Sequence, residues 1–489
     1  MLSLRRITTE QLHERRWELL ALTSVGAFMG PLDGSIVSVA LPVMGRDLGL
    51  SFAASMWVQA AYLLTMAVLL IPLGRLADAR GRVRFYLLGT AVFTCGSVLA
   101  ALSVNGTWLI GSRIFQAAGA ALLGATAGAI VTAVFPPRER GRALGINVMA
   151  VYLGLSVGPP LGGFLADGLG WRWIFLINLP IGLLVLLWGW RLLPRSEREA
   201  GAPGAPRADT LGAALLAAFL ISLLVPLTFA PEWGWAAPHT VLPLLAAFAA
   251  LAGFVLAERR APRPLLDLDL LLHNRLFAAA NLAALLNYMA LYAVSILTAI
   301  WLEVVQGRSA GLTGWLMLGQ PLMMAALSPF SGRLSDRIGS RVLATGGMVG
   351  VAGGMVVLGS MPAAAGMARV VAGLVVVGLG MAAFSAPNTS AIMGSVRRDQ
   401  LSLASAFTGT MRTVGQALSV AVLGGIAASQ LGRVGSRLLF THGHGAGAVA
   451  ARAVDGYASG YALALFAGAG LALLGAAVSL TRGAHAAAP

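Results

Sequence analysis

An aspartate inside an apolar run is the residue of this sequence whose surroundings most favour proton chemistry. Asp33 stands in the stretch Pro31-Leu-Asp-Gly-Ser, within a hydrophobic segment that begins near Trp17. A charge at the centre of a bilayer costs about 3 kcal/mol on insertion scales, so this carboxylate must face protein or water. Burial favours its neutral form and a nearby cation favours its charged form. We therefore predict that Asp33 binds and releases the coupling proton; the alternative is a structural carboxylate that pairs permanently with an arginine.

Arg113 is the predicted partner of Asp33. The helix that carries Asp33 is expected to end near Leu41, and the helix that carries Arg113 is expected to begin near Thr107. At about 1.5 Å per residue, both side chains lie roughly 8–13 Å below the outer surface. When Asp33 is protonated, Arg113 is released toward the substrate or Gln116. The alternative for Arg113 is snorkelling to the interface.

These two residues must be positioned by membrane-spanning helices. Hydrophobic residues make up 58% of the 489 residues and charged residues only 11%, which is the composition of a polytopic membrane protein. The hydrophobic pattern predicts an all-α fold with fourteen transmembrane helices. They are expected at 18–41, 54–74, 84–104, 107–135, 143–166, 173–193, 211–230, 240–257, 277–303, 312–330, 342–361, 367–389, 401–429 and 457–480.

The arginines predict the orientation. The net charge is +15, but the basic residues gather in alternate loops between spans, for example around Arg80 and Arg140, rather than in one patch for nucleic acid. This bias places both termini in the cytoplasm of a multi-pass protein of the bacterial cytoplasmic (inner) membrane.

A repeated loop predicts two related halves. Gly74, Asp78, Gly81 and Arg82 follow the second span, and Gly332, Asp336, Arg337 and Gly339 follow the tenth. We predict that both are cytoplasmic gating loops whose glycines form tight turns; loops that serve only topology are the alternative. The expected domains are a six-helix bundle at 1–195, a linker with a two-helix insert at 196–275, and a second six-helix bundle at 276–489, with the substrate between the bundles.

Further candidates lie in the other spans. Gly154, Gly158 and Gly162, with Gly163 and the kink at Pro159, favour close helix packing at the seam between the bundles, although an ordinary small-residue helix contact explains them equally well. Glu303 is either a second acid for cationic substrates or an interfacial residue. Sparse polar residues are expected to line the cavity or to bridge helices: Gln59, Tyr62, Gln116, Asn147, Asn281, Asn287, Tyr288, Tyr292, Gln320, Asn388, Arg412 and Gln416.

Several functions are excluded or disfavoured. No Gly-x4-Gly-Lys-[Ser/Thr] motif occurs, since the sequence has no lysine, so ATP does not drive the protein. His442 and His444 form an H-x-H in a predicted outer loop at 430–456, for which a solvated loop is a better explanation than a metal site. We predict no enzyme activity, no metal and no cofactor, with the proton gradient as the energy source.

Five motifs in order resemble the major facilitator superfamily, in its fourteen-helix drug/proton antiporter branch of the EmrB/QacA type. The similar stretches are 33–42, 74–84, 113–119, 154–163 and 171–180, with departures at Ser35, Ser38, Ala79, Val83 and Ala117. The resemblance implies two six-helix bundles plus a two-helix insert, a proton-coupled antiport mechanism by alternating access, and a role in antibiotic resistance.

The expected cargo is a small hydrophobic or amphipathic compound exported from the lipid bilayer or the cytoplasm, because a mostly apolar pocket with few polar anchors fits such molecules. Short outer loops leave passage across an outer membrane to a separate periplasmic adaptor protein. An exporter of a lipid, a siderophore or another specific metabolite remains an alternative, as does a non-transporting sensor or scaffold.

Overall fold

The computed structural model is all-helical in the part of the chain that it describes, which is residues 15–136, 139–192, 210–261, 268–397, 401–431, 435–436, 439–440 and 447–482. Fourteen of its helical segments are long and apolar enough to cross a membrane. This confirms the predicted fold class and the number of spans.

The N-terminal half, defined as helices α2 to α8, contains the first six spans. Its helices are α2 (Arg16–Asp47), α3 (Phe52–Arg80), α4 (Arg82–Ala101), α5 (Gly106–Val134), α6 (Arg140–Gly168), α7 (Trp173–Leu176) and α8 (Asn178–Leu192). The sixth span is broken between α7 and α8, just before Asn178.

The two-helix insert and the C-terminal half follow. The insert consists of α10 (Thr210–Trp233) and α11 (Pro238–Arg260). After the short α12 (Leu268–His273), the C-terminal half comprises α13 (Arg275–Ile300), the π-helical turn η1 (Trp301–Val305), α14 (Ala310–Met317), α15 (Gly319–Ile338), α16 (Ser340–Gly359), α17 (Met367–Gly394), α18 (Leu401–Ser429) and α20 (Gly447–Leu480).

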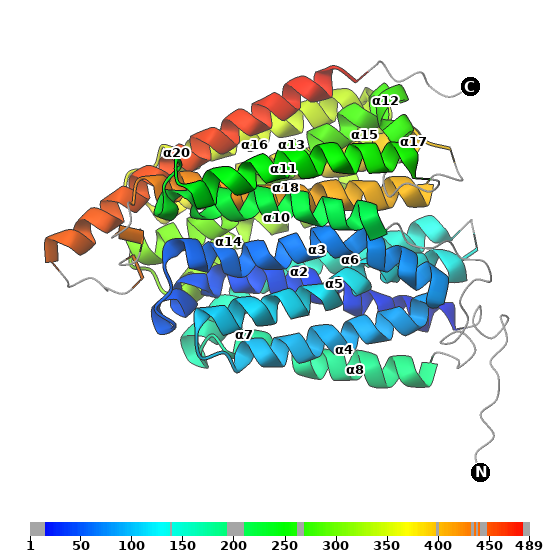
Figure 1. Ribbon diagram of the computed structural model, residues 1–489, viewed down its shortest axis with the longest axis horizontal. Coiled ribbons are helices and arrows are strands. Elements are labelled where there is room, and N and C mark those ends of the chain that lie inside the picture. The colour runs from blue at the N-terminus through cyan, green and yellow to red at the C-terminus, as the bar shows by residue number, and fades with distance from the viewer. Residues whose placement is uncertain are drawn as a thin grey trace, which may run out of the picture.

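The helices run side by side in one bundle. In Figure 1 the early helices, in blue and cyan, lie on one side, the late ones, in yellow to red, lie on the other, and α10 and α11 lie between them in green. The two halves meet where α6 packs against α14 and where α3 packs against α18, and α10 also contacts α3 and α18. Asp33 lies on α2, which contacts α13 and α14 of the C-terminal half, whereas Arg113 lies on α5, which packs against α2, α3 and α4 inside its own half.

Local chemistry explains many of the helix ends. The side chains of Ser51, Asn105 and Asn274 cap α3, α5 and α13 by accepting a backbone N–H from the first turn. Gly81 and Gly339 join α3 to α4 and α15 to α16 with φ angles of +107° and +87°. Only glycine adopts such a backbone readily, so the predicted need for glycine in both repeated loops is confirmed.

Several predicted boundaries were wrong. The second and tenth spans do not end at 74 and 330, because α3 continues to Arg80 and α15 to Ile338, so most of each repeated loop is helical. The first span does not end near Leu41, because α2 continues through Pro42 to Asp47; a proline removes one hydrogen bond of the ladder but can be accommodated as a kink. The predicted outer loop at 430–456 is shorter, since α20 begins at Gly447 and projects beyond the bundle (Figure 1). The alanine-rich stretch after Gly447 favours helix.

Some predictions fall outside the described residues or stay untested. His442, His444 and the linker around residue 200 lie outside the described residues. The domain boundaries at 195 and 275 stay predictions.

Backbone contact between α4 and α5 depends on Gly119. A Cβ atom at this position would lie 2.7 Å from the carbonyl oxygen of Gly89 and 2.8 Å from the Cα of Phe93. These are backbone atoms, which cannot move aside as a side chain can. Because Gly119 has no side chain, the helix that carries Arg113 can pack with its backbone directly against α4.

We expect Gly119→Ala to destabilise the protein by about 1–3 kcal/mol, because overpacking forces the two helices apart. Thermal unfolding of the purified protein in detergent measures this. Gly111→Ala, on the same helix, is the control, because a Cβ atom there meets nothing within 4 Å. Equal melting temperatures for the two variants would contradict the interpretation.

Candidate functional site

The centre of the site is a fully buried ion pair between α2 and α5. Nη1 of Arg113 donates to Oδ2 of Asp33 at 2.5 Å, and both side chains have a relative exposure of 0%. The structure thus places the predicted partners together. Because α2 extends to Asp47, Asp33 lies farther from the end of its helix than the predicted 8–13 Å. The carboxylate of Asp33 and the guanidinium of Arg113 are nevertheless in contact.

Gln116 and Gln59 complete the surroundings of the pair. Nε2 of Gln116 donates to Oδ1 of Asp33 at 2.8 Å and to Oγ of Ser97 at 2.8 Å, while Oε1 of Gln116 accepts from Arg113. The guanidinium also donates to Oε1 of Gln59 at 3.3 Å and to the carbonyl of Val58 at 3.4 Å. Arg113 therefore has acceptors in place besides the carboxylate.

Asn178 is a member of this network that the sequence reasoning missed. Its Nδ2 donates to Oδ1 of Asp33 at 3.1 Å, and the residue is fully buried. It reaches the carboxylate from the first residue of α8, directly after the break in the sixth span. The sequence feature that could have identified Asn178 is that it is a lone amide in an apolar run, within the stretch 171–180 that resembles a family motif.

Two tyrosines frame the arginine. The ring of Tyr62 lies against Arg113, with 4.2 Å from the guanidinium carbon to the ring centroid, a cation–π contact. Tyr292 comes from α13 of the C-terminal half, and its hydroxyl lies 3.4 Å from where a Cβ atom of Gly34 would stand. The ion pair is therefore next to a residue of the other half.

The glycines of α6 divide between two neighbours. A Cβ atom at Gly154 would lie 2.6 Å from the carbonyl oxygen of Phe28, and one at Gly162 would lie 2.8 Å from that of Ile36, so this stripe, with Gly158 between, packs on α2 inside the same half. Residues four apart share one helix face, and this face of α6 meets α2. The predicted location of these three glycines at the seam between the halves is therefore wrong.

The seam between α6 and α14 is instead formed by the adjacent face of α6. Gly163 touches the backbone of Ala310, and Gly314 touches the carbonyl of Pro159. The backbones of the two halves are thus in direct contact here.

Polar contacts also join the halves where α6 meets the start of α14. The predicted orientation makes this the outer end of the bundle. Asp167 of α6 accepts the backbone N–H groups of Ala310 at 3.2 Å and Gly311 at 2.6 Å, at the N-terminus of α14. A carboxylate favours this position because it meets the positive end of the helix dipole. Sequence reasoning missed Asp167.

Glu303 lies at this end as well. It stands in η1 with its side chain fully buried, and Oε2 lies 3.6 Å from Nη2 of Arg46 on α2. Within the described residues, neither carboxylate oxygen has a hydrogen-bond partner. Glu303 is therefore part of a contact between the halves and not an exposed interfacial residue.

The repeated loops lie at the opposite end. Arg82, the first residue of α4, donates to Asp78 of α3 at 2.5 Å across the turn at Gly81, and both side chains are about half exposed. Gly74, Gly332, Arg337 and the backbone of Asp336 belong to α3 and α15, and the side chain of Asp336 lies outside what the structure describes.

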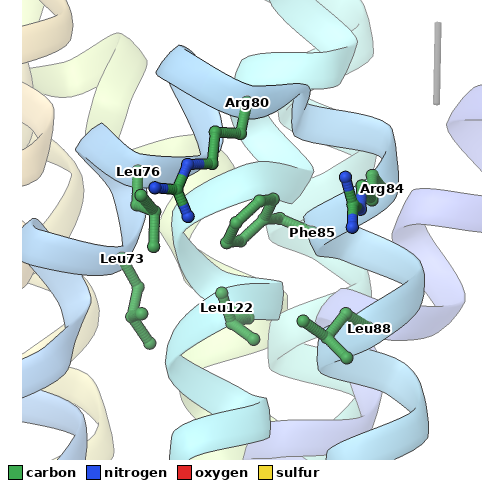
Figure 2. A pocket seen from close by; sticks show the side chains of 7 residues that line it. All are labelled: Leu73, Leu76, Arg80, Arg84, Phe85, Leu88 and Leu122. Carbon is green, nitrogen blue, oxygen red and sulfur yellow. The ribbon is translucent and has the colours of Figure 1, made fainter. Parts of the chain in front are cut away.

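A cavity of about 560 Å³ adjoins the first loop. In Figure 2 the ring of Phe85 lies between Arg80 and Arg84, and none of the residues lining the cavity belongs to the Asp33 network. Its lining residues are Leu73, Leu76, Arg80, Arg84, Phe85, Leu88 and Leu122.

The remaining polar candidates separate into two groups. Asn287 donates to Sδ of Met381 at 3.0 Å and Gln320 accepts from Ser295 at 3.4 Å, so both bridge helices inside the C-terminal half. Tyr288 and Arg412 lie together and face the N-terminal half, as described below. Asn147 is half-buried on α6.

Arg482 is a further residue that the sequence reasoning missed. It follows α20, has a relative exposure of 1% and donates to Oδ1 of Asn388 on α17. Burial lowers the pKa of Arg482 to about 10, so it remains charged at neutral pH. It ties the end of the last helix to α17.

These features define the class of protein. Fourteen apolar helices in two halves surround a buried carboxylate with a cationic partner, and in the described ranges no three His, Cys, Asp or Glu side chains gather as metal ligands. The molecule is a polytopic membrane protein with a buried ion pair between two of its helices.

Comparison with known proteins identifies the family. Residues 23–272 match the model of the Major Facilitator Superfamily, and the chain belongs to this family. It is 32% identical to the riboflavin transporter RibZ of Clostridioides difficile, over 86% of this chain and 90% of the relative. It is 35% identical to the multidrug resistance protein Stp of Mycobacterium tuberculosis, over 85% and 77%. A solved bacterial homologue of the human lysosomal transporter Spinster matches with a TM-score of 0.66 at 17% identity, covering 96% of both chains.

We expect Arg113→Gln to destabilise the protein by about 3–5 kcal/mol, because it leaves the carboxylate of Asp33 buried without its cation. The double variant Asp33→Asn/Arg113→Gln removes both charges and should be more stable than Arg113→Gln alone. Melting temperatures in detergent provide the comparison. A double variant that loses the sum of the two single effects would show that the charges are not coupled.

We expect Asp167→Ala to weaken closure of the predicted outer end, because the N-terminus of α14 loses its acceptor. Spin labels at Leu169 and Ala363, placed on cysteines in a Cys95→Ser background, report the distance between the halves. The distribution should shift toward longer distances than in the same labelled protein with Asp167 intact. An unchanged distribution would mean that Asp167 does not hold this end closed.

Proposed function

We propose that the protein exports hydrophobic or amphipathic compounds in exchange for protons, with Asp33 as the proton-binding residue and Arg113 as the group that responds to it. One observation carries the proposal: a fully buried carboxylate is paired with an arginine that has other acceptors within reach. The amide oxygens of Gln116 and Gln59 remain as acceptors for the guanidinium when the carboxylate is neutral.

The network provides a path for the exchange. When Asp33 takes up a proton, the Coulomb attraction to Arg113 is lost, and the guanidinium remains bound by Gln116, Gln59 and the ring of Tyr62. The protonated carboxyl remains next to Gln116 and Asn178. Neither group is left buried without a partner, so the change costs less than breaking an ordinary buried ion pair.

The position of the network links it to movement of the halves. Asp33 shares α2 with Arg46, which contacts Glu303 in the other half, and α2 packs along α6, which carries Asp167. A shift of α2 therefore acts on both contacts at the predicted outer end. Rocking of two halves about such contacts gives access to alternate sides of the membrane.

The range of cargo has two candidates. Similarity to Stp, a multidrug resistance protein, supports a broad range of drugs. Similarity to RibZ, a riboflavin transporter, supports a specific metabolite instead. Either range of cargo is compatible with the proposed exchange for protons, so the identity of the cargo is a separate question from the mechanism.

Transport in proteoliposomes with an imposed pH gradient tests the proposal. We expect uphill transport of rhodamine 6G, coupled to proton movement that an internal pH-sensitive dye reports, and we expect Asp33→Asn to reduce it to the level of empty liposomes. Asp47→Asn, an exposed carboxylate on the same helix, is the matched control and should retain transport.

Uphill transport by Asp33→Asn at the wild-type rate, in correctly inserted protein, would refute the proton role of this residue. Riboflavin, tested in the same liposomes, separates the two cargo ranges. Saturable transport of riboflavin with rejection of rhodamine 6G would favour the specific metabolite.

A further inference from the structure

Arg412 is a charged residue within a membrane-spanning helix. It lies on α18 roughly 8 Å from Phe407 and roughly 26 Å from Ser429, the ends of the membrane-spanning segment, at about 1.5 Å per residue. Its side chain is nevertheless exposed. A cation at this depth needs water, a counter-ion or a ligand.

The exposed face of α18 points toward the other half and not toward lipid. Ser405, Gly409, Arg412 and Gln416 share this face, being spaced by four, three and four residues. A Cβ atom at Gly409 would lie 3.7 Å from Cδ2 of Leu70, which belongs to α3 in the N-terminal half. The opposite face packs inside its own half, because Gly415 touches the backbone of α13.

Side chains from both halves gather around the guanidinium. Arg412 and Ser385 both lie next to the side chain of Tyr288, close enough to influence its hydroxyl. The hydroxyl of Tyr152, from α6 of the N-terminal half, lies 3.3 Å from that of Ser385. We refer to Arg412, Tyr288, Ser385 and Tyr152 as the Arg412 cluster. It is formed by four helices, three from one half and one from the other.

The charge of the cluster is not balanced. Six salt bridges join described residues, and Arg412 takes part in none of them. Arg113, at a similar place between helices, is neutralised by Asp33. A guanidinium has a planar fork of N–H donors that fits a carboxylate or another oxyanion, and one neutral tyrosine hydroxyl leaves most of these donors available.

We propose that the Arg412 cluster binds the acidic group of the cargo, so that the transporter accepts amphipathic organic anions. Arg412 binds the oxyanion, and the rings of Tyr288 and Tyr152 contact an adjoining aromatic system, since aromatic side chains provide apolar surface with a polar tip. This rests on the proposed transport function and specifies the substrate class. It does not depend on the proton role of Asp33.

Two dyes with the same xanthene core test the proposal: carboxyfluorescein, which is anionic, and rhodamine 6G, which is cationic. Fluorescence anisotropy with the purified full chain in nanodiscs measures the Kd of each dye without a proton gradient. Arg412→Gln should weaken carboxyfluorescein binding about 10- to 100-fold, the range for losing a charge-assisted hydrogen bond. Rhodamine 6G binding should change less than carboxyfluorescein binding or become tighter.

Three further variants make the result specific. Arg412→Lys keeps the charge but loses the fork, so it should retain part of the affinity for carboxyfluorescein. Tyr288→Phe keeps the ring and should weaken carboxyfluorescein binding less than Arg412→Gln does. Arg191→Gln, an exposed arginine at the end of α8, is the control and should leave both affinities unchanged.

The proposal would be overturned if wild-type protein bound rhodamine 6G but not carboxyfluorescein. Equal loss of both dyes in folded Arg412→Gln would also overturn it, because that pattern indicates a structural role. Since binding is measured without a gradient, normal uphill transport by Asp33→Asn would refute the proton proposal and leave this one standing.

Discussion

The structure depends on one electrostatic constraint: Asp33 and Arg113 are both removed from water, and each charge offsets the cost of burying the other. Polar groups from α3, α4 and α8 surround the pair and satisfy its remaining donors and acceptors. Five helices are thereby held at defined distances from one another. The N-terminal half is organised around this network, which we propose is rearranged when Asp33 takes up a proton.

Close backbone contact keeps this network in place while allowing the halves to move. Gly119 brings α5 onto α4, and Gly154 and Gly162 bring α6 onto α2, so the helices inside the half are joined without intervening side chains. At the seam, Gly163 and Gly314 give equally close contact between α6 and α14. Small residues let the backbones of neighbouring helices approach this closely.

Charges at the two ends of the bundle have different roles. Near the predicted outer end, Asp167 and the pair of Arg46 with Glu303 connect one half to the other. At the opposite end, the Asp78–Arg82 contact joins α3 to α4 inside one half. Between them, Arg412 presents an unbalanced positive charge toward the N-terminal half, which is where a charged cargo would have to be recognised.

Much of the fold and the centre of the site could be predicted from the sequence. Spans follow from long apolar runs, and the pairing of Asp33 with Arg113 follows from two opposite charges at membrane depth on helices of the same half. Glycine in the repeated loops follows from the tight turns that they form.

The rest could not be predicted because it depends on tertiary contacts. Which face of α6 meets α2 and which meets α14 depends on how the halves dock, so the direction of the glycine stripe was misjudged. Asn178 reaches Asp33 only because the sixth span breaks beside it. Asp167 acts on a helix that begins more than a hundred residues later in the chain.

The most direct test of the central claim is infrared difference spectroscopy of the purified protein between alkaline and acidic pH, with Asp33→Asn as the reference. The proposed mechanism predicts a protonated carboxyl band that appears in the wild type on acidification and is missing in Asp33→Asn. If the two proteins gave the same carboxyl bands, Asp33 would stay ionised beside Arg113, and the pair would be structural.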